Sequence, residues 1–423
     1  MASIFSEVTK SWKSLDYVCG WFFKFAEYSA NSAAACAFVS TNSISQGEQV
    51  ARLWPLLLAR KLRISFAHTS FKWANLASHN AGVTVVIVGL AKTSGQGTLF
   101  VNGDAGETTK VVVENICPYL VPYQNIIISA ESDTLADLTE ITNGNKPADG
   151  GGLILNFNDA AVIRSANPDV GRRLVRRFVG AKDSIQGKLR YCLWITEDEC
   201  QLANSVSEVG DRLDKVREFR EKSPKPLTQK GVSTPHAFQQ IRQDGEETPV
   251  VIPRHSSVAR PYLPISLHGS GTIVADGAFA IFEDQLLNFS LISSRIHLTW
   301  IATVCGKIKT DYRYSSTLGW NTFPVPTLTS QNRADLAESA SGILLTREAH
   351  WPSTIAELYD PGKMPDELRA AHDRNDETLE RIYIGRRFKN DTERLETLFR
   401  MYTEITSGKA NVSAKTTSES SNE

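Results

Sequence analysis

An apolar run rich in β-branched residues at 83–90, VTVVIVGL, constrains the fold most, because such runs form buried strands. It follows a predicted helix at 14–30 with an apolar stripe, a predicted strand at 33–44 and a second predicted helix at 47–61. Pro55 lies inside the second helix and predicts a kink or a new turn there. Helix, strand, helix and paired strands in this order predict the end of an α/β sheet.

Composition divides the rest of the chain. Residues 91–106 are rich in Gly, Ser, Thr and Asn, which is typical of a surface loop. Short β-like runs alternate with helical stretches from about Val111 to Pro326, which predicts a separate α+β domain. We therefore expect domains at 1–106, 107–326 and 327–406, then a polar tail at 407–423 that is disordered.

The helical C-terminal region has one apolar face, and Asn390 or Asp391 is expected to cap its last helix. This face contains Leu395, Leu398, Phe399 and Tyr402.

Charge and cysteine content exclude several classes of protein. The 46 Lys and Arg residues balance 47 Asp and Glu residues, so any DNA binding must depend on local clusters. The six cysteines form no CxxC pair and no Cys/His ligand spacing, so we expect neither a metal site nor a disulfide framework. No apolar run approaches the roughly 18 residues of a membrane span, and we expect a cytoplasmic protein.

Several sequence motifs are too specific to be explained by fold class alone. Together they resemble the MmeI-like adenine-N6 DNA methyltransferases over residues 15–402. The motifs are LDYVCGWF, AFVSTNSISQGEQV, ISFAHTSFKWANLASHNAGVTVVIVGL, QGKLRYCLWI, PYLPI, ATVCGKIKTDYRYSSTLGWNTFPVP and AAHDRNDETLERIYIGRRF. The resemblance implies the truncated end of a Rossmann-like methyltransferase sheet, an α+β target-recognition domain and a helical tail. It also implies double-stranded DNA as a partner and S-adenosyl-L-methionine as the cofactor of the complete enzyme.

Two family motifs are missing from the sequence. The glycine-rich cofactor turn and the Asn-Pro-Pro-aromatic catalytic loop of the family belong upstream of Leu15; GQGTLF and GSGTIV fail the spacing, and the only Asn-Pro is Asn167-Pro168. We expect a chain that is inactive alone, binds no cofactor by itself and works with an upstream N-terminal polypeptide that carries the cofactor-binding half. The alternative is a stand-alone DNA-binding or specificity module.

Aromatic residues before the last predicted strand are candidates for base stacking, because an enzyme that modifies adenine must first rotate it out of the duplex. The resemblance places Phe71 and Trp73 in a loop that leads into this strand and implies that they stack on the flipped base. Packing between loop and sheet is the equally weighted alternative. A general-base role for His68 is less favoured, and Asn42 is expected to cap the helix at 47–61 rather than to border the adenine.

The stretch CGKIKTDYRYSS is the densest signal for DNA reading. In an extended segment Lys309 and Asp311 point the same way, so that Lys could donate to guanine while Asp accepts from cytosine of one base pair. An exposed ion pair without function is the alternative, and the resemblance favours base reading. Arg313 is a further candidate base contact, and Lys307 a candidate phosphate contact.

Two other basic clusters are candidate DNA contacts. The run GRRLVRR predicts phosphate contacts from arginines at helical spacing, although a solvated helix face is the usual explanation. Its members are Arg172, Arg173, Arg176 and Arg177. Arg254 and Arg260 lie in a proline-stiffened loop and are candidate base contacts, with a plain surface loop about equally favoured.

Overall fold

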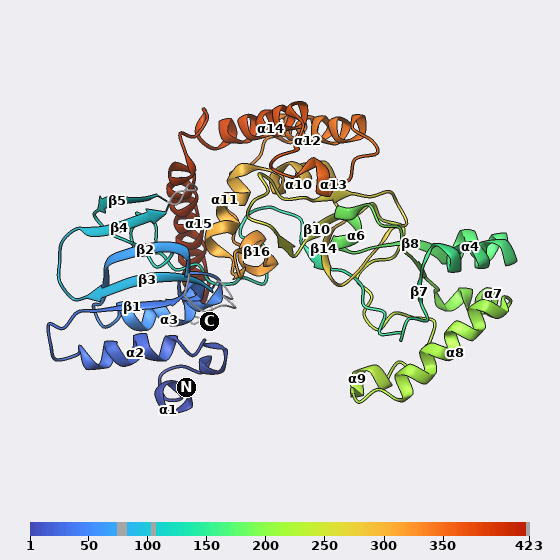
Figure 1. Cartoon of the computed structure of the whole chain (residues 1–423), viewed down its shortest axis with the longest axis horizontal. Helices are drawn as coiled ribbons and strands as arrows, with labels where there is room; N and C mark the ends of the chain where they lie inside the picture. Colours follow the sequence, from blue (N-terminus) through green and yellow to red (C-terminus); the bar gives the residue numbers. More distant parts are fainter. Residues whose placement is uncertain (74–82, 103–106, 420–423) are drawn as a thin grey trace. The chain divides into compact units, whose positions relative to one another are not determined.

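The computed structural model describes residues 1–73, 83–102 and 107–419, with side chains through residue 408. It divides into two compact units (Figure 1). Unit 1 contains Met1–Leu138, Ile296–Thr327 and Glu380–Glu423, and unit 2 contains Thr139–Arg295 and Leu328–Leu379. Across the described ranges, every helix is too short or too polar to span a bilayer.

Unit 1 contains a five-stranded sheet in the order β1-β3-β2-β4-β5. Its strands are β1 (Cys36–Thr41), β2 (Arg63–Trp73), β3 (Val83–Ala91), β4 (Gly97–Asn102) and β5 (Thr108–Val113). β2 and β4 pair in parallel, and the other neighbours are antiparallel. The strands predicted at 33–44 and 83–90 are confirmed, whereas β4 lies where the sequence predicted a loop. The predicted domain boundary at 106 falls between β4 and β5, which pair with each other.

Helices cover one face of this sheet. They are α1 (Ala2–Phe5), η1 (Trp12–Ser14), α2 (Cys19–Tyr28), η2 (Asn42–Ser45) and α3 (Glu48–Leu58). Phe22 of α2 packs on Phe38 of β1 at a ring distance of 4.7 Å, and Phe38 is paired with buried Val88. The Val88 side of the sheet is therefore the covered side. Pro55 is accommodated inside α3, and Gly47 rather than Asn42 is the N-cap residue of this helix.

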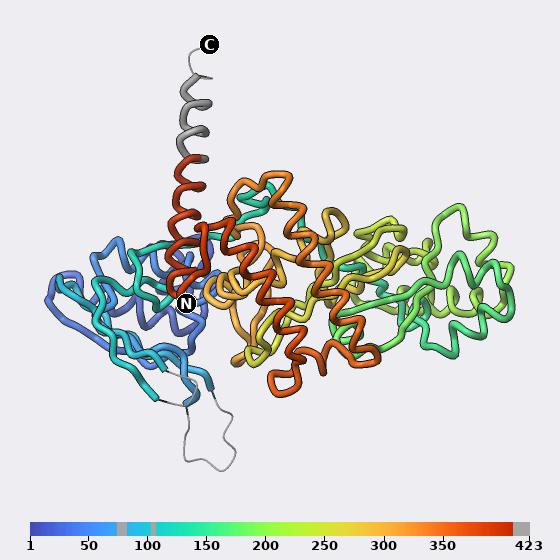
Figure 2. The backbone as a smooth tube through the Cα atoms, turned by 90° about the horizontal axis from the view of Figure 1, so that it is seen from above, coloured from blue at the N-terminus to red at the C-terminus, as the bar shows by residue number. Residues whose placement is uncertain are grey.

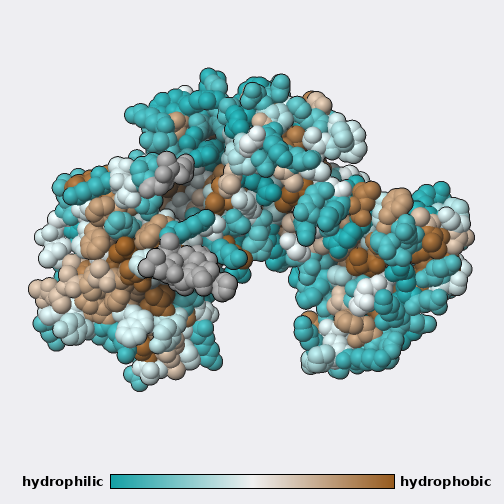
Figure 3. Space-filling model, in the orientation of Figure 1, coloured by the Kyte–Doolittle hydropathy of each residue, from teal (hydrophilic) through white to brown (hydrophobic). Residues whose placement is uncertain are grey.

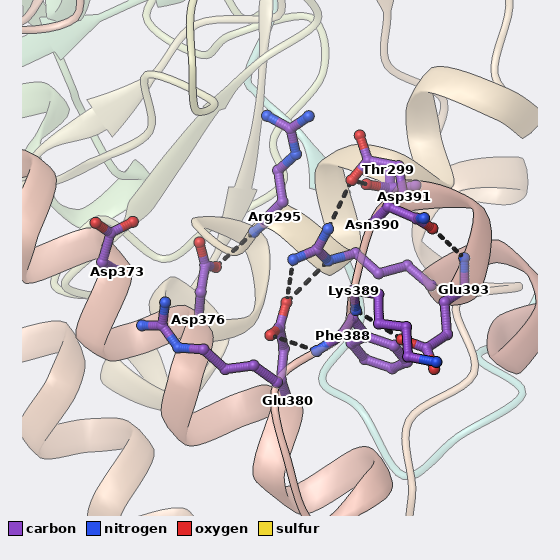
Figure 4. A network of polar contacts seen from close by, with 12 residues as sticks. Arg295, Thr299, Asp373, Asp376, Glu380, Phe388, Lys389, Asn390, Asp391 and Glu393 are labelled. Atoms are coloured by element: carbon purple, nitrogen blue, oxygen red, sulfur yellow. Dashed lines mark hydrogen bonds and ion pairs between the residues drawn. The ribbon is translucent and has the colours of Figure 1, made fainter.

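The remainder of unit 1 comes from later in the chain. Its elements are α11 (Arg295–Val304), β15 (Lys307–Ile308), β16 (Asp311–Arg313), η4 (Ser316–Trp320) and α15 (Asp391–Glu419). The Asn390 side chain accepts from the Glu393 N–H at 3.0 Å, which confirms the predicted cap, and Figure 4 shows this contact. α15 continues to Glu419 where the sequence predicted disorder, because no proline follows Asp391 to stop it.

A buried carboxylate fixes the start of α15. Glu380 is 2% exposed and forms an ion pair with Arg394, and its second oxygen accepts from the Phe388 N–H at 3.0 Å (Figure 4). Phe399, one helical turn beyond Leu395, packs on Tyr123 at a ring distance of 5.1 Å. The predicted apolar face of this helix is confirmed, since its four residues are buried.

Unit 2 contains two four-stranded sheets, in the orders β12-β10-β14-β6 and β13-β8-β9-β7. Their strands are β6 (Thr142–Asn143), β7 (Ile154–Leu155), β8 (Val175–Val179), β9 (Tyr191–Leu193), β10 (Val250–Pro253), β12 (Ser266–Leu267), β13 (Ile273–Val274) and β14 (Ala278–Ile281); β11 (His255–Ser256) is a further short strand. Several of these coincide with the predicted β-like runs, which agrees with the α+β character expected of this region.

The helices of unit 2 surround these sheets. They are α4 (Phe157–Ala166), α5 (Pro168–Leu174), α6 (Ala181–Gln186), η3 (Glu197–Glu199), α7 (Cys200–Asn204), α8 (Ser207–Glu221), α9 (Pro226–Gln229), α10 (Gln285–Ile292), α12 (Ser330–Ala349), α13 (Ile355–Leu358) and α14 (Asp366–Ile384), whose last residues from Glu380 onwards belong to unit 1. α12 and α14 lie side by side (Figure 2), and Ser339 donates to Thr378 between them at 3.3 Å. Arg347 of α12 is buried and donates to the Tyr359 hydroxyl, which also bonds His372 at 2.6 Å.

Candidate DNA interface

One extra residue in β2 aligns a row of rings on the face of the unit 1 sheet opposite to α2. His68 lies opposite Ile87 and Phe71 lies opposite Val85, so three steps along β2 match two along β3. Such a β-bulge places His68 and Phe71 on the same side of the sheet, although strict alternation would place them on opposite sides. Trp73 follows opposite Val83 on the same face.

The rings contact one another along this face. His68 stacks on Phe100 of β4 at 4.2 Å, Phe71 lies 6.4 Å from His68, and Trp73 lies 6.3 Å from Phe71, all between ring centroids. Phe66 precedes them and lies over Gly89, where a Cβ atom would come within 2.2 Å of its ring. We call these five residues the aromatic row.

The aromatic row is partly open to solvent. Trp73 is 45% exposed, and Val39 and Val83 on the same face are 52% and 48% exposed. Figure 3 shows hydrophobic residues on the surface of the part of the molecule that holds this sheet. An open apolar face with aligned rings is suited to stacking on a flat aromatic ligand.

The predicted position of Phe71 and Trp73 in a loop is wrong, because both lie in β2 and pair with β3. Thr69 and Ser70 lie at the register shift between His68 and Phe71 and form the bulge. The rest of the expected loop, 74–82, lies outside the described residues. Phe66 and Phe100 were not predicted; Phe66 could have been found, since it shares the strand alternation of His68.

Polar residues border the aromatic row. The Asn42 side chain donates to the Ser70 hydroxyl at 3.4 Å, so Asn42 connects the end of β1 to the bulge instead of capping α3. Burial lowers the pKa of His68, which leaves the imidazole neutral near pH 7. A neutral ring stacked on Phe100 contributes an aromatic surface without a positive charge.

The basic stretch at 305–313 folds as a tight hairpin. Lys307 pairs with Tyr312 and Ile308 pairs with Asp311, and the Arg313 N–H donates to the Gly306 carbonyl at 3.0 Å. Lys309 is in the turn with a φ of 57°. Two-residue hairpin turns require such left-handed backbone, because it matches the twist of the strands.

The turn changes the geometry expected of Lys309 and Asp311. They do not belong to one extended segment, so strand alternation does not place their side chains on the same edge. Asp311 and Arg313 are the pair that shares a face, since both lie in β16. Lys309, Asp311 and Arg313 are exposed, and none forms an ion pair with another described residue.

The arginine cluster at 172–177 is divided between two elements, so the predicted helical spacing is wrong. Arg172 and Arg173 lie in the last turn of α5, and Arg176 and Arg177 lie in β8. Because α5 ends at Leu174, the four side chains do not share one helix face. Arg172 pairs with Asp169, Arg173 with Glu199 at 3.2 Å and Arg176 with Glu246 at 2.5 Å.

Arg254 and Arg260 have different surroundings in unit 2. Arg254 follows β10, stacks over the Phe279 ring at 4.4 Å and donates to the Asn143 side chain at 2.6 Å. The backbone N–H of Arg260 closes a turn with the Ser257 carbonyl at 3.3 Å. Arg254 is therefore held by packing, whereas Arg260 is positioned by a loop.

Family models match successive parts of the chain. The model described as "MmeI, DNA-methyltransferase domain" matches residues 1–101. The model described as "MmeI, target recognition domain" matches 122–327, and "MmeI, C-terminal domain" matches 328–409.

Two relatives match almost all of the chain. DNA methyltransferase A of Bacillus subtilis (strain 168) is 39% identical over 408 residues, which are 96% of this chain and 45% of the relative. The solved structure of the Type IIL restriction-modification enzyme MmeI in complex with DNA is similar with a TM-score of 0.85 and 34% identity; the match covers 96% of this chain and 54% of that one. The chain thus spans about half the length of these relatives. On these matches the chain belongs to the MmeI-like DNA methyltransferase family.

Proposed function

We propose that this chain is the target-recognition part of a site-specific adenine-N6 DNA methyltransferase. It binds double-stranded DNA and receives the flipped adenine on the aromatic row. The aromatic row is the observation that carries the proposal, because a module that only bound DNA would not need rings aligned on a partial methyltransferase sheet. S-adenosyl-L-methionine supplies the methyl group in the complete enzyme.

Stacking is the contribution that these rings can make. An adenine rotated out of the duplex loses its neighbouring bases, and an aromatic face replaces part of that stacking. Each base-aromatic contact is worth about 1–3 kcal/mol. Trp73 is the last ring of β2, and it is more exposed than Phe71.

The described residues do not fit S-adenosyl-L-methionine by themselves. Methyltransferase-like sheets hold such ligands at a strand-to-helix turn whose free N–H groups face the ligand. Between β1 and α3 the only glycine is Gly47, and its N–H already donates to the Val304 carbonyl at 3.1 Å. In the complete enzyme, we assign cofactor binding to an upstream N-terminal polypeptide.

DNA contacts are assigned by side-chain chemistry. Exposed Lys309, Asp311 and Arg313 on the hairpin offer donors and an acceptor for base edges in the major groove. Arg254 and Arg260 are further base contacts. The 172–177 arginines and Lys307 contact phosphates, which hold register without reading sequence.

Base flipping is tested with the purified chain and a duplex obtained by site selection. Each adenine of the selected site is replaced in turn by fluorescent 2-aminopurine. We expect the fluorescence to rise at one position, and Phe71→Ala or Trp73→Ala to abolish the rise and to weaken binding about tenfold. Tyr28→Ala, which removes an exposed ring of α2, is the matched control. Sequence-specific binding without any rise would favour the stand-alone DNA-binding module.

Base reading is tested by exchanging the charges of the hairpin. In Lys309→Glu with Asp311→Arg, the new Glu accepts from cytosine and the new Arg donates to guanine, so the preferred base should change at one position. Site selection on a randomised duplex library gives the outcome. An unchanged preference at every position would remove this pair as a base reader.

A further inference from the structure

Three side chains of different chemistry meet at the edge of unit 2 although they are far apart in the sequence. Glu197 lies in η3, Cys200 begins α7, and His236 lies in the loop that follows α9. One carboxylate oxygen, the thiol sulfur and one imidazole nitrogen all lie within 4.8 Å of one another. Spacing along the chain does not indicate this cluster, because only Glu197 and Cys200 are close in sequence.

The three donors have the chemistry of a zinc site. Zn²⁺ binds thiolate, imidazole and carboxylate ligands, and bond lengths of about 2.0–2.3 Å put tetrahedral ligand atoms about 3.3–3.6 Å apart. His236 Nε2 already lies 3.0 Å from a Glu197 oxygen. A thiolate and a carboxylate together balance the charge of a divalent cation, so the bound ion would leave no net charge among its ligands.

The neighbours of the site already have other partners, which leaves the three donors available. One oxygen of Glu199 accepts from the backbone and hydroxyl of Thr196, and the other pairs with Arg173. Among the described residues, the Cys200 thiol makes only one long contact, which is 3.7 Å to the Thr196 carbonyl. Glu197 is 83% exposed in its side chain and bonds only His236 among the described residues.

Hydrogen bonds and ring packing hold the chain on either side of His236. Arg220 is 1% exposed and donates to the carbonyls of Thr234 at 2.9 Å and Ala237 at 2.7 Å, on either side of His236. Phe238 packs edge-on against Trp194 at a ring distance of 5.1 Å. Such contacts preorganise the ligand, so less conformational freedom is lost when an ion binds.

From this convergence we propose that Glu197, Cys200 and His236 form an exchangeable Zn²⁺ site. Three protein ligands leave a fourth position for water, as in open rather than closed zinc sites. The ion connects the start of α7 to the loop after α9, and it stabilises this end of unit 2. This site is separate from the aromatic row and does not depend on the proposed DNA function.

Cobalt titration of the whole chain tests the site, since Co²⁺ bound to a thiolate gives a charge-transfer absorption band that Zn²⁺ then displaces. We expect one equivalent to bind with this band. Cys200→Ser should abolish the band, and Glu197→Gln or His236→Gln should weaken binding at least about tenfold. Cys36→Ser and His255→Gln, which alter a partly buried thiol and an exposed imidazole, are the matched controls.

Thermal unfolding separates binding from folding defects. Glu197 is exposed, so Glu197→Gln should unfold at the wild-type temperature when a chelator is present. Zn²⁺ should then raise the midpoint of the wild type and of the controls more than that of Glu197→Gln. Equal zinc effects on wild type and Glu197→Gln, or no thiolate band in the wild type, would overturn the proposal.

Discussion

Arg176 and Arg177 are adjacent in β8, and only Arg176 is neutralised by a carboxylate that the structure describes. Arg176 pairs with Glu246 at 2.5 Å, whereas Arg177 is exposed and has no ion pair with another described residue. Neighbours in a strand point to opposite faces, which explains the difference. The pKa of His268 is lowered to about 4, first by burial and second by the positive charge of Arg177.

This relationship predicts which arginine contributes to DNA binding. A free guanidinium gains more from a phosphate than one that must first leave a carboxylate. Arg177→Ala should reduce the slope of log affinity against log salt by about one. Arg176→Ala should reduce it less. Binding titrations at several salt concentrations measure both slopes, and equal changes would contradict this assignment.

The buried His297 predicts an acid-sensitive unit 1. Burial lowers the pKa of His297 to about 3, and its Nε2 lies 3.0 Å from the Tyr314 hydroxyl at the base of the hairpin. The unfolded chain binds a proton near the ordinary pKa of about 6.5, so the folded state loses stability as pH falls from about 6.5 towards 3. This group alone contributes up to about 1.4 kcal/mol per pH unit in that window.

The measurement compares denaturant midpoints at pH 7 and pH 5. His297→Gln is expected to be less stable at pH 7 and to lose less stability on acidification than the wild type. His255→Gln replaces an exposed histidine and should retain the wild-type pH dependence. A wild-type acid slope in His297→Gln would show that other groups cause it.

Arg220 predicts a large loss of stability from a conservative substitution. Its guanidinium donates to the carbonyls of Pro147, Ala148, Gly231, Thr234 and Ala237. A lysine ammonium lacks the planar five-donor arrangement of the guanidinium and cannot reach all five carbonyls. Each buried acceptor left without a partner costs about 1–3 kcal/mol. Arg220→Lys should therefore lower the free energy of unfolding by at least about 3 kcal/mol.

Urea denaturation gives this value, with Arg217→Lys as the matched control on the same helix. Arg217 forms an exposed ion pair with Asp214, so its replacement should change the free energy of unfolding by less than about 1 kcal/mol. Similar effects of the two substitutions would mean that water molecules donate to the five carbonyls in the Arg220→Lys variant.

Replacing two glycines of unit 2 by alanine should change the stability of the fold in opposite directions. A Cβ atom at Gly144 would lie 2.0 Å from the Ala275 carbonyl oxygen, and backbone cannot move away as a side chain can. Gly144→Ala should destabilise the fold by about 3 kcal/mol. Gly210 lies inside α8 with open space around it, so Gly210→Ala should stabilise the fold by about 0.5–1 kcal/mol. Thermal unfolding of the two variants checks both signs.

Regular elements were predictable from the sequence where their periodicity is uninterrupted. The run at 83–90 and the helix with Leu395 and Phe399 were found because burial of one face dominates their pattern. β4 was missed because Gly95 and Gly97 made its surroundings resemble a loop.

The candidate sites were harder to predict, because they depend on local departures from regular geometry. The bulge in β2 reverses the side on which Phe71 lies, and the left-handed turn at Lys309 breaks the alternation on which its pairing with Asp311 relied. The convergence of Cys200 and His236 depends on tertiary packing, which spacing along the chain does not contain.

The chain order of unit 1 has a consequence for how the protein is made. Tyr119 and Tyr123 pack against Phe399, so residues near the N-terminal sheet receive their packing partner only after most of the chain has left the ribosome. Closing so long a segment is slow and leaves apolar surface exposed meanwhile. The larger segment of unit 2, Thr139–Arg295, is continuous in sequence and is synthesised before Phe399. A nascent chain stalled before Phe399 should therefore need chaperone protection over unit 1.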